Sequence, residues 1–218
     1  MTYEEIRRDH AVQVYIAKAD ETLDALGFTE HSFAHVTKVA ETAGKMMNIL
    51  GYSSRDAELA RIAGYLHDIG NVVNRVDHSQ SGAVMAFRIL DRMDFPPEEI
   101  AAIVSAIGNH DEGTGVPVSP MAAALIIADK SDVRRSRVRA KEDIASDIHD
   151  RVNYAVTQSS LEIFLEQREI LLTLTIDPEI SDLMEYFEIF TKRMLLCRKA
   201  AQKLGCAFRL KINGQLVA

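Results

Sequence analysis

The stretch Ala63-Gly64-Tyr65-Leu66-His67-Asp68-Ile69-Gly70 ends an apolar helical pattern with two residues that can bind a metal. Adjacent side chains on a helix project about 100° apart, so His67 and Asp68 can each face one side of a shared metal cluster. The carboxylate of Asp68 can also bridge two ions. Adjacent His and Asp arise often by chance, so the pair gains meaning only from the residues that accompany it.

Candidate ligands accompany this pair in other predicted helices. His35 lies early in one helical segment, and Asp129 ends the apolar run Leu125-Ile126-Ile127-Ala128. A carboxylate at the end of an apolar helix is costly to bury without a cation or several donors. His78 opens one further helix, and His110 closes another. The pattern therefore predicts a metal site formed by residues that are distant in the sequence.

The hydrophobic periodicity of the first two thirds of the chain is helical. Apolar residues at helical spacing, with capping signals at the ends, predict helices over residues 2–26, 32–50, 54–70, 79–92, 96–109 and 120–133. The segment from Asp111 to Pro120 contains two glycines and two prolines and is predicted to be a loop.

The pattern changes near residue 160. Leu161, Ile163 and Leu165 alternate with polar residues, as do the apolar residues between 170 and 176, which predicts a hairpin. A long helix from Asp177 to Leu204 and a short strand around residues 208–212 follow. We therefore expect a mainly α protein, with a helical bundle over residues 1–154 and a small α+β appendage over residues 155–218.

Composition and charge narrow the function. The chain has 218 residues and a formal net charge of −7, which disfavours nucleic acid as a partner because phosphate neutralisation needs a broad basic surface. The longest apolar run, Met121 to Ala128, is far shorter than the roughly 20 residues of a membrane span. Cys197 and Cys206 are the two cysteines of the chain, so a disulfide framework is not expected. We therefore expect a cytoplasmic location.

Three motifs in order resemble the HD superfamily of metal-dependent phosphohydrolases. They are His35-Val36-x-x-Val39-Ala40-x-x-Ala43, the stretch quoted above, and Ile127-Ala128-Asp129-Lys130. The resemblance spans roughly residues 28–140. The additional His78 and His110 resemble the branch with extra histidine ligands and two metals, which includes symmetrical diadenosine tetraphosphate hydrolases and cyclic-dinucleotide phosphodiesterases of the HD-GYP type.

The resemblance implies a role for each ligand. Asp68 would bridge two ions, and His67 and Asp68 would be the catalytic residues. His35, His67 and Asp129 would hold one ion, with His78 and His110 on the other. Imidazole and carboxylate ligands suit Fe, Mn, Ni or Zn. Two such ions about 3.5–4 Å apart can bind phosphate oxygens and activate a water.

The chain also departs from the family pattern. Many relatives have a lysine that contacts the substrate phosphate where this chain has Asn71. The GYP motif is missing, which argues against cyclic di-GMP as the substrate. The loop from Asp111 to Gly115 has its own sequence, so the choice of substrate does not transfer.

Residues near the ligands are candidates for substrate binding. The basic run from Lys130 to Lys141 follows Asp129 directly, and Arg134 and Arg137 are expected to share a helical face and bind non-scissile phosphates. The alternative is a solvated charge run. His31, four residues before His35, is expected on the same helical face, either facing the substrate or as a partly exposed histidine at the helix start. Asn71 completes the predicted substrate-binding set.

We therefore expect hydrolysis of a phosphate ester or anhydride in a nucleotide or similar small metabolite. One alternative is a di-iron oxygenase on the same scaffold, because the ligand set alone does not separate the two chemistries. Another is a non-enzymatic signalling module, although a complete ligand set argues against it. The C-terminal segment is a candidate surface for homodimerisation.

Overall fold

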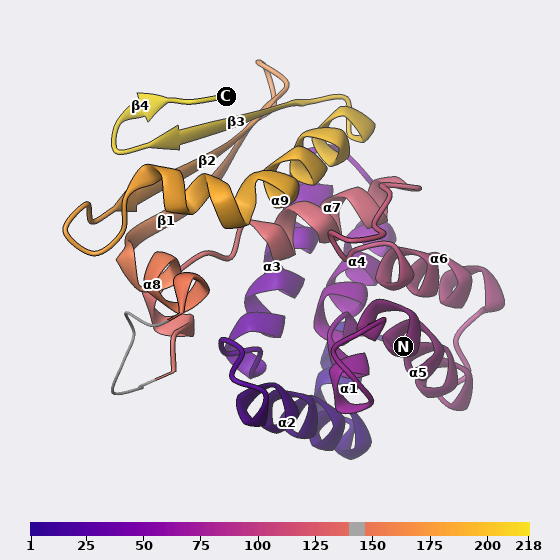
Figure 1. Ribbon diagram of the computed structural model, residues 1–218. Coiled ribbons are helices and arrows are strands. Elements are labelled where there is room, and N and C mark those ends of the chain that lie inside the picture. The colour runs from indigo at the N-terminus through magenta and orange to yellow at the C-terminus, as the bar shows by residue number, and fades with distance from the viewer. Residues whose placement is uncertain (140–146) are drawn as a thin grey trace.

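The computed structural model describes residues 1–139 and 147–218, and it is built mainly of helices (Figure 1). The helices before residue 131 are α1 (Tyr3–Arg8), α2 (His10–Ala25), α3 (Phe33–Ile49), α4 (Ser54–Leu66), the 3-10 turn η1 (Ile69–Val72), α5 (His78–Arg92), α6 (Pro97–Gly108) and α7 (Pro120–Lys130). The remaining elements are the 3-10 turn η2 (Arg135–Arg137), α8 (Ile148–Ala155), β1 (Val156–Phe164), β2 (Glu169–Ile176), α9 (Leu183–Lys203), β3 (Ala207–Ile212) and β4 (Gln215–Leu216).

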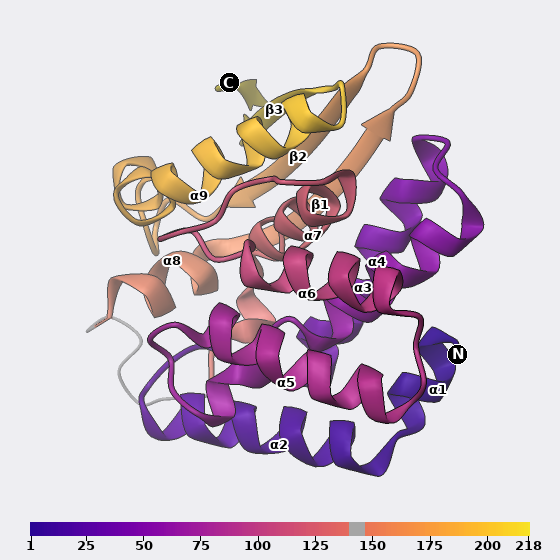
Figure 2. The same ribbon diagram turned by 90° about the vertical axis from the view of Figure 1, so that its right-hand side faces the viewer.

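Helix α7 is the central element of the molecule. Every residue from Met121 to Lys130 is buried, because α3, α4, α6 and α9 all pack around it. A helix that is apolar on all sides is stable only when it is enclosed in this way. The two views show α7 between α9 and the N-terminal helices (Figures 1 and 2). Asp129, near the end of α7, is thereby carried into the interior.

Helices α3 and α4 approach each other closely at Gly64. A Cβ atom added there would lie 2.7 Å from the Cα atom of Ala40, which real Cβ contacts do not allow. Gly70 has a similar role, because an added Cβ would collide with the backbone at the start of α5. These two glycines let the backbones meet near His67 and His78.

The C-terminal part is a four-stranded sheet with α9 against it. The strand order is β1-β2-β3-β4, with antiparallel β1/β2 and β3/β4 pairs and a parallel β2/β3 pair that α9 connects. Side chains of this part and of the helical part form one continuous apolar core. The prediction of a mainly α fold with a C-terminal α+β appendage is confirmed. The boundary at residue 154 stays a prediction.

Four predicted helices have different limits in the structure. The predicted helix 54–70 ends at Leu66, and residues Ile69–Val72 form the separate 3-10 turn η1. The predicted helix 2–26 is broken at Asp9, whose backbone is extended and whose carboxylate accepts a hydrogen bond from the Val12 amide at the start of α2. The predicted helix from Asp177 begins only at Leu183, because Asp182 is its N-cap. The predicted helix 120–133 ends at Lys130.

The observed limits of α7 and α3 correct two expectations about side-chain placement. Arg134 has an extended backbone and Arg137 lies in η2, so they do not share a helical face. His31 precedes α3, whose N-cap is Ser32, so it does not share a helical face with His35. Lys141 lies outside the described residues. Within the described ranges, no helix is long and apolar enough to cross a membrane.

Candidate metal centre

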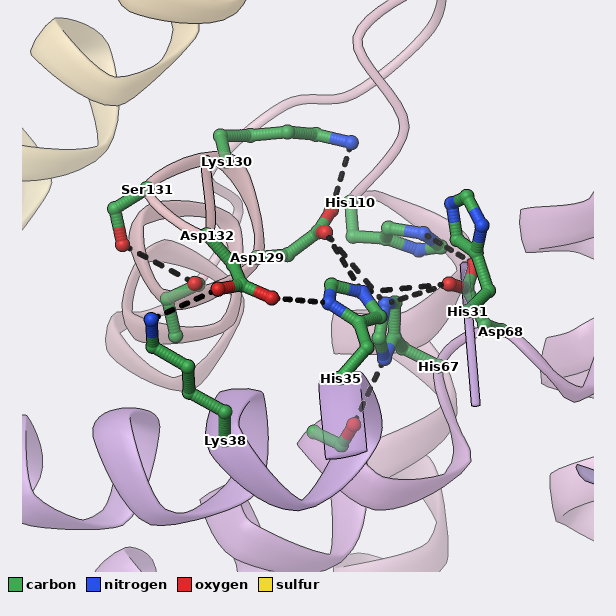
Figure 3. Close-up of polar contacts among 12 residues, drawn as sticks. His31, His35, Lys38, His67, Asp68, His110, Asp129, Lys130, Ser131 and Asp132 are labelled. Atoms are coloured by element: carbon green, nitrogen blue, oxygen red, sulfur yellow. Dashed lines mark hydrogen bonds and ion pairs between the residues drawn. The ribbon is translucent and has the colours of Figure 1, made fainter. Parts of the chain in front are cut away.

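The structure brings all six predicted ligands together in the interior. His35 is in the first turn of α3, His67 and Asp68 follow the end of α4, and His78 begins α5. His110 follows α6, and Asp129 lies in the last turn of α7. All six are buried. Figure 3 shows His35, His67, His110 and the two carboxylates around one centre.

The four histidines have the same orientation. Each Nδ1 atom faces a group that can only accept a hydrogen bond: Asp132 Oδ2 for His35 (2.8 Å), Gly64 O for His67 (2.8 Å), Arg75 O for His78 (3.1 Å) and Ile107 O for His110 (2.6 Å). Nδ1 therefore carries a proton, and each Nε2 points toward the centre, where the neutral imidazole has a lone pair for a metal. This is the tautomer that a histidine needs when it binds a metal through Nε2.

Asp68 lies between two pairs of histidines. Its Oδ2 atom is 3.6 Å from His35 Nε2 and 3.2 Å from His67 Nε2. Its Oδ1 atom is 3.5 Å from His78 Nε2 and 3.9 Å from His110 Nε2. Each oxygen of one carboxylate thus faces its own pair of imidazoles.

Asp129 faces one of these pairs. Its Oδ1 atom lies 3.4 Å from His35 Nε2 and 3.7 Å from His67 Nε2. Two groups of three residues have ligand atoms within 4.8 Å of one another. The first group is His35, His67 and Asp129, and the second is His67, Asp68 and His110. His78 completes the second group, because its Nε2 is 3.3 Å from His110 Nε2.

The electrostatics of the centre favour a cation. His35 Nε2, His67 Nε2 and Asp68 Oδ2 are buried and have no hydrogen-bond partner among the described residues. Burial lowers the pKa of His67, but the attraction of Asp68 and Asp129 outweighs it and raises that pKa to about 10. The centre thus attracts positive charge, and its imidazole and carboxylate donors fit a divalent transition metal.

Asp132 holds His35 in place, and sequence reasoning missed it. Asp132 is buried, and its carboxylate accepts a hydrogen bond from His35 Nδ1. It also forms ion pairs with Lys38 Nζ (2.9 Å) and Arg134 Nε (2.8 Å). Burial alone would raise the pKa of Asp132, but the hydrogen bond from His35 and the nearby arginines hold it well below its usual range. The available signal was its position three residues after Asp129, a spacing that places two residues on one side of a helix.

Asn71 contacts Asp68 directly. Its Nδ2 donates to the backbone carbonyl of Asp68 (2.9 Å) and to its Oδ1 (3.1 Å), and its side chain is fully buried. The structure therefore places this predicted substrate-binding residue where it fixes the orientation of the Asp68 carboxylate.

Lys130 connects the centre to the C-terminal helix. Its Nζ is 2.7 Å from Asp129 Oδ2 and 3.3 Å from Glu112 Oε2. Glu112 also pairs with Arg193 of α9, through contacts of 3.3 and 3.4 Å. Arg193 was not among the predicted site residues, because the sequence of α9 showed only an apolar stripe. The structure thus makes the C-terminal part a neighbour of the predicted metal ligands.

The other predicted substrate-binding residues have protein partners as well. Arg134 pairs with Asp132 and, at 3.6 Å, with Glu30. Arg137 is buried and donates to the carbonyls of Glu30 and Asp132, both at 3.0 Å. His31 donates from Nδ1 to Thr29 O (2.7 Å), and its ring centroid is 5.4 Å from that of His35.

A cavity of about 340 Å³ adjoins these groups. Its walls include Phe28, His31, Arg75, Glu112, Arg137 and Arg193. It is therefore bordered by elements from both ends of the chain, and by residues that contact or neighbour the predicted metal ligands.

Residues 32–152 match the HD domain family. The chain therefore belongs to the HD-domain family, and its buried His and Asp cluster makes it a member that can bind divalent metal.

Individual relatives are more distant. The chain is 27% identical over 162 residues to an uncharacterised protein of Methanocaldococcus jannaschii, and 29% identical over 175 residues to ribonuclease Y of Campylobacter jejuni subsp. doylei. These alignments cover 64% and 73% of this chain, but only 62% and 33% of the relatives. A crystal structure of a predicted HD superfamily hydrolase from an uncultured Thermotogales bacterium matches with 26% identity and a TM-score of 0.46, over 60% of this chain and 73% of that one.

Proposed function

We propose that this protein is a metal-dependent phosphohydrolase that uses two divalent transition-metal ions to hydrolyse a phosphate ester or anhydride of a nucleotide or similar small metabolite. The observation that carries the proposal is the position of Asp68, whose two oxygens face the His35/His67 pair and the His78/His110 pair. A carboxylate so placed can bridge two ions.

The ligands divide between two sites in this proposal. His35, His67 and Asp129 hold one ion, His78 and His110 hold the other, and Asp68 is shared. Bound ions of this kind supply Lewis-acid polarisation of a phosphoryl oxygen and activation of a water nucleophile. Fe, Mn, Ni and Zn all suit the donor set.

The surrounding residues keep the ligands in their binding form. Asp132 keeps the proton of His35 on Nδ1, and Asn71 holds the Asp68 carboxylate. Lys130 compensates part of the negative charge of Asp129. In this arrangement the protein provides pre-oriented donors, while substrate anions enter through the adjoining cavity.

The cavity favours a small substrate. Its volume of about 340 Å³ lies near the lower end of the usual range for ligand pockets, roughly 300–1,000 Å³. Arg75 on its wall has no carboxylate partner among the described residues and favours an anion. Ribonuclease Y is named for RNA, but the net charge of −7 disfavours a long polyanion here. We therefore favour a nucleotide or sugar phosphate over RNA, with a ribo-oligonucleotide as one arm of the test.

Elemental analysis of anaerobically purified protein, followed by a hydrolysis panel, tests the proposal. We expect bound transition metal and, when Mn or Fe is present, hydrolysis of at least one substrate in a panel of phosphomonoesters, phosphoanhydrides, phosphodiesters and a ribo-oligonucleotide. Phosphate release measures the monoesters and anhydrides, and the appearance of the monoester product measures the diesters. Asp68→Ala should lose both metal and turnover while keeping its fold, and His10→Ala, a change at an exposed histidine, should lose neither. Turnover that requires dioxygen, with no hydrolysis of any substrate in the panel, would instead support the oxygenase alternative.

Metal stoichiometry tests the number of ions. We expect two ions per wild-type chain and one in a double variant with His78→Ala and His110→Ala. Anomalous scattering can locate them. A single ion in the wild type, with His78 and His110 turned away from it, would contradict the binuclear proposal and leave the family assignment intact.

A further inference from the structure

Most cations around the metal centre already have a protein carboxylate as partner. Lys130 pairs with Asp129 and Glu112, and Arg193 pairs with Glu112. Lys38 and Arg134 pair with Asp132. The buried Arg137 instead donates to two backbone carbonyls. These groups support the architecture of the centre, so they are poorly available to a ligand.

Arg75 differs from all of them. Its half-buried guanidinium makes no ion pair with any carboxylate in residues 1–139 or 147–218. Its polar side-chain contacts there are Nη1 to Asn71 Oδ1 and Nη1 to His78 Nε2, both at a long 3.4 Å. An unpaired guanidinium that is partly desolvated gains much from an anion, and its planar fork matches phosphate oxygens.

The position of Arg75 is at the border between the centre and the cavity. Its Nη1 is 3.4 Å from a predicted metal ligand, His78, while the residue also lines the cavity. The guanidinium carbon lies 5.5 Å from the centroid of the Phe28 ring, which is 41% exposed and lines the same cavity. This cation–π contact attracts the guanidinium to the ring face and restrains its position beside the cavity.

We propose that Arg75 is the residue that binds the phosphoryl group of the substrate, at the point where the cavity meets the metal centre, with Phe28 as the apolar wall behind it. This inference rests on the proposed function, since it names the substrate contact of the same site. It gives a phosphate-binding role to a loop residue between η1 and α5, whereas the sequence predicts that Arg134 and Arg137 bind the non-scissile phosphates.

The acids in the cavity are consistent with this placement. Glu112 is paired with Lys130 and Arg193, so its charge is compensated. Asp147 is the N-cap of α8 and accepts hydrogen bonds from backbone amides there, and Asp150 lies in the first turn of that helix. Neither forms an ion pair with Arg75, whereas the contact between Arg75 and His78 borders the centre.

Titration of metal-loaded protein with inorganic phosphate, followed by calorimetry, tests the inference without a known substrate. We compare the wild type with Arg75→Ala, Arg75→Gln and Arg75→Lys. Arg88→Ala is the matched control, because Arg88 is 79% exposed on α5 and pairs only with the nearby Asp91 among the described residues. Metal content is measured for every sample.

We expect the dissociation constant for phosphate to rise at least about tenfold in Arg75→Ala and Arg75→Gln, which corresponds to 1.4 kcal/mol. Arg75→Lys should be intermediate because it keeps the charge and loses the fork. Arg88→Ala should match the wild type, and all variants should hold the same amount of metal.

Three results would overturn the inference. The first is unchanged phosphate affinity in fully metal-loaded Arg75→Gln. The second is loss of metal in all three Arg75 variants, which would make Arg75 a support for His78. The third is a metal-loaded wild type that binds no phosphate. A wild type that binds metal and phosphate but hydrolyses nothing in the panel would contradict the proposed function alone.

Discussion

At the scale of single residues, the metal affinity of the centre is expected to depend on side chains that contact the predicted ligands and would not contact the ions themselves. Asp132 is the clearest case, because its Oδ2 accepts the Nδ1 proton of His35 at 2.8 Å. A carboxylate in this position makes the imidazole a stronger base and keeps its Nε2 free for a metal. Lys38 and Arg134 compensate the carboxylate, so it can remain ionised although it is buried.

Asp132→Asn should therefore weaken metal binding by about 10- to 100-fold, the usual cost of losing such a partner. The charge would be lost while the shape of the side chain is kept, so the fold should survive. Titration of apo protein with Zn or Mn measures the effect. Asp91→Asn, at a half-exposed surface carboxylate, is the control and should bind like the wild type. Equal affinities in both variants would show that Asp132 has no influence on the metal.

Glu112 adds a pH dependence to stability. Burial alone would raise its pKa, but Lys130 and Arg193 outweigh this and lower it to about 2. The folded-state pKa therefore lies below the unfolded-state value of about 4.3. Its ionised form stabilises the fold fully above that unfolded value, and the contribution is lost as the pH falls through about 2.

Glu112→Gln should consequently reduce the free energy of unfolding at pH 7 by about 1.5–3 kcal/mol, the range for hydrogen bonds to charged groups. The difference from the wild type should shrink as the pH falls from about 4.5 toward 2. Urea denaturation of both apo proteins at pH 7, 5, 4 and 3 measures it. A difference that stays constant over this range would mean that the ion pair of Glu112 with Lys130 and Arg193 does not stabilise the fold.

At the scale of elements, the close approach of α3 and α4 positions half of the ligands. His35 lies near the start of α3 and His67 at the end of α4, and the helices meet at Gly64 with no room for a Cβ beside Ala40. Any residue larger than glycine would push the two helices apart. The distance between His35 and His67 would then grow, because His35 moves with α3 and His67 moves with α4.

Gly64→Ala should destabilise the protein by about 1–3 kcal/mol, as overpacking of a core does, and it should lower the metal content. Gly108→Ala is the matched control, since a Cβ there would lie 3.7 Å from its nearest neighbour on a helix. That change should cost nothing or stabilise by up to about 1 kcal/mol. Thermal unfolding and elemental analysis of both variants give the answer, and equal stability of the two would contradict the close-packing account.

At the scale of the whole molecule, α7 joins the two parts of the chain. It carries Asp129 and is buried on every side, and α9 supplies one of those sides. In Figure 2, α9 lies along α7 with the sheet beyond it. The C-terminal part therefore completes the core of the helical part, and through Arg193 it also reaches the centre.

A chain that ends at Ala155 should fail to unfold cooperatively and should bind little metal. Its loss of α9 would expose apolar residues of α7, and each large side chain that is uncovered costs about 1.5–3 kcal/mol. Thermal unfolding followed by circular dichroism measures this, with Arg193→Ala as a control that keeps the core intact. A folded, metal-binding fragment would contradict this expectation. It would support residues 155–218 as an independent unit, and homodimerisation would then be the predicted role of that unit.

The sequence by itself determined the helical class and the HD family, and it predicted the six candidate ligands that the structure brings together. Each ligand is a polar residue at the end or start of an apolar segment, and such a residue is visible without any knowledge of its neighbours. Helix limits were less well predicted, because Asp9 and Asp182 break or begin helices through local hydrogen bonds that compete with the apolar pattern.

Only the tertiary structure decided which groups meet around the ligands. His35 and Asp132 are 97 residues apart, and Glu112 and Arg193 are 81 apart. It also separated the cations that pair with carboxylates or backbone carbonyls from Arg75, whose two polar contacts among the described residues are long, and no count of basic residues could do this. In the sequence, Lys130, Arg134 and Arg137 looked available to bind phosphate, because the sequence shows that a residue is charged but does not show its partners. Their partners depend on how α3, α7 and α9 pack, and the free energy of that packing is spread over the whole core.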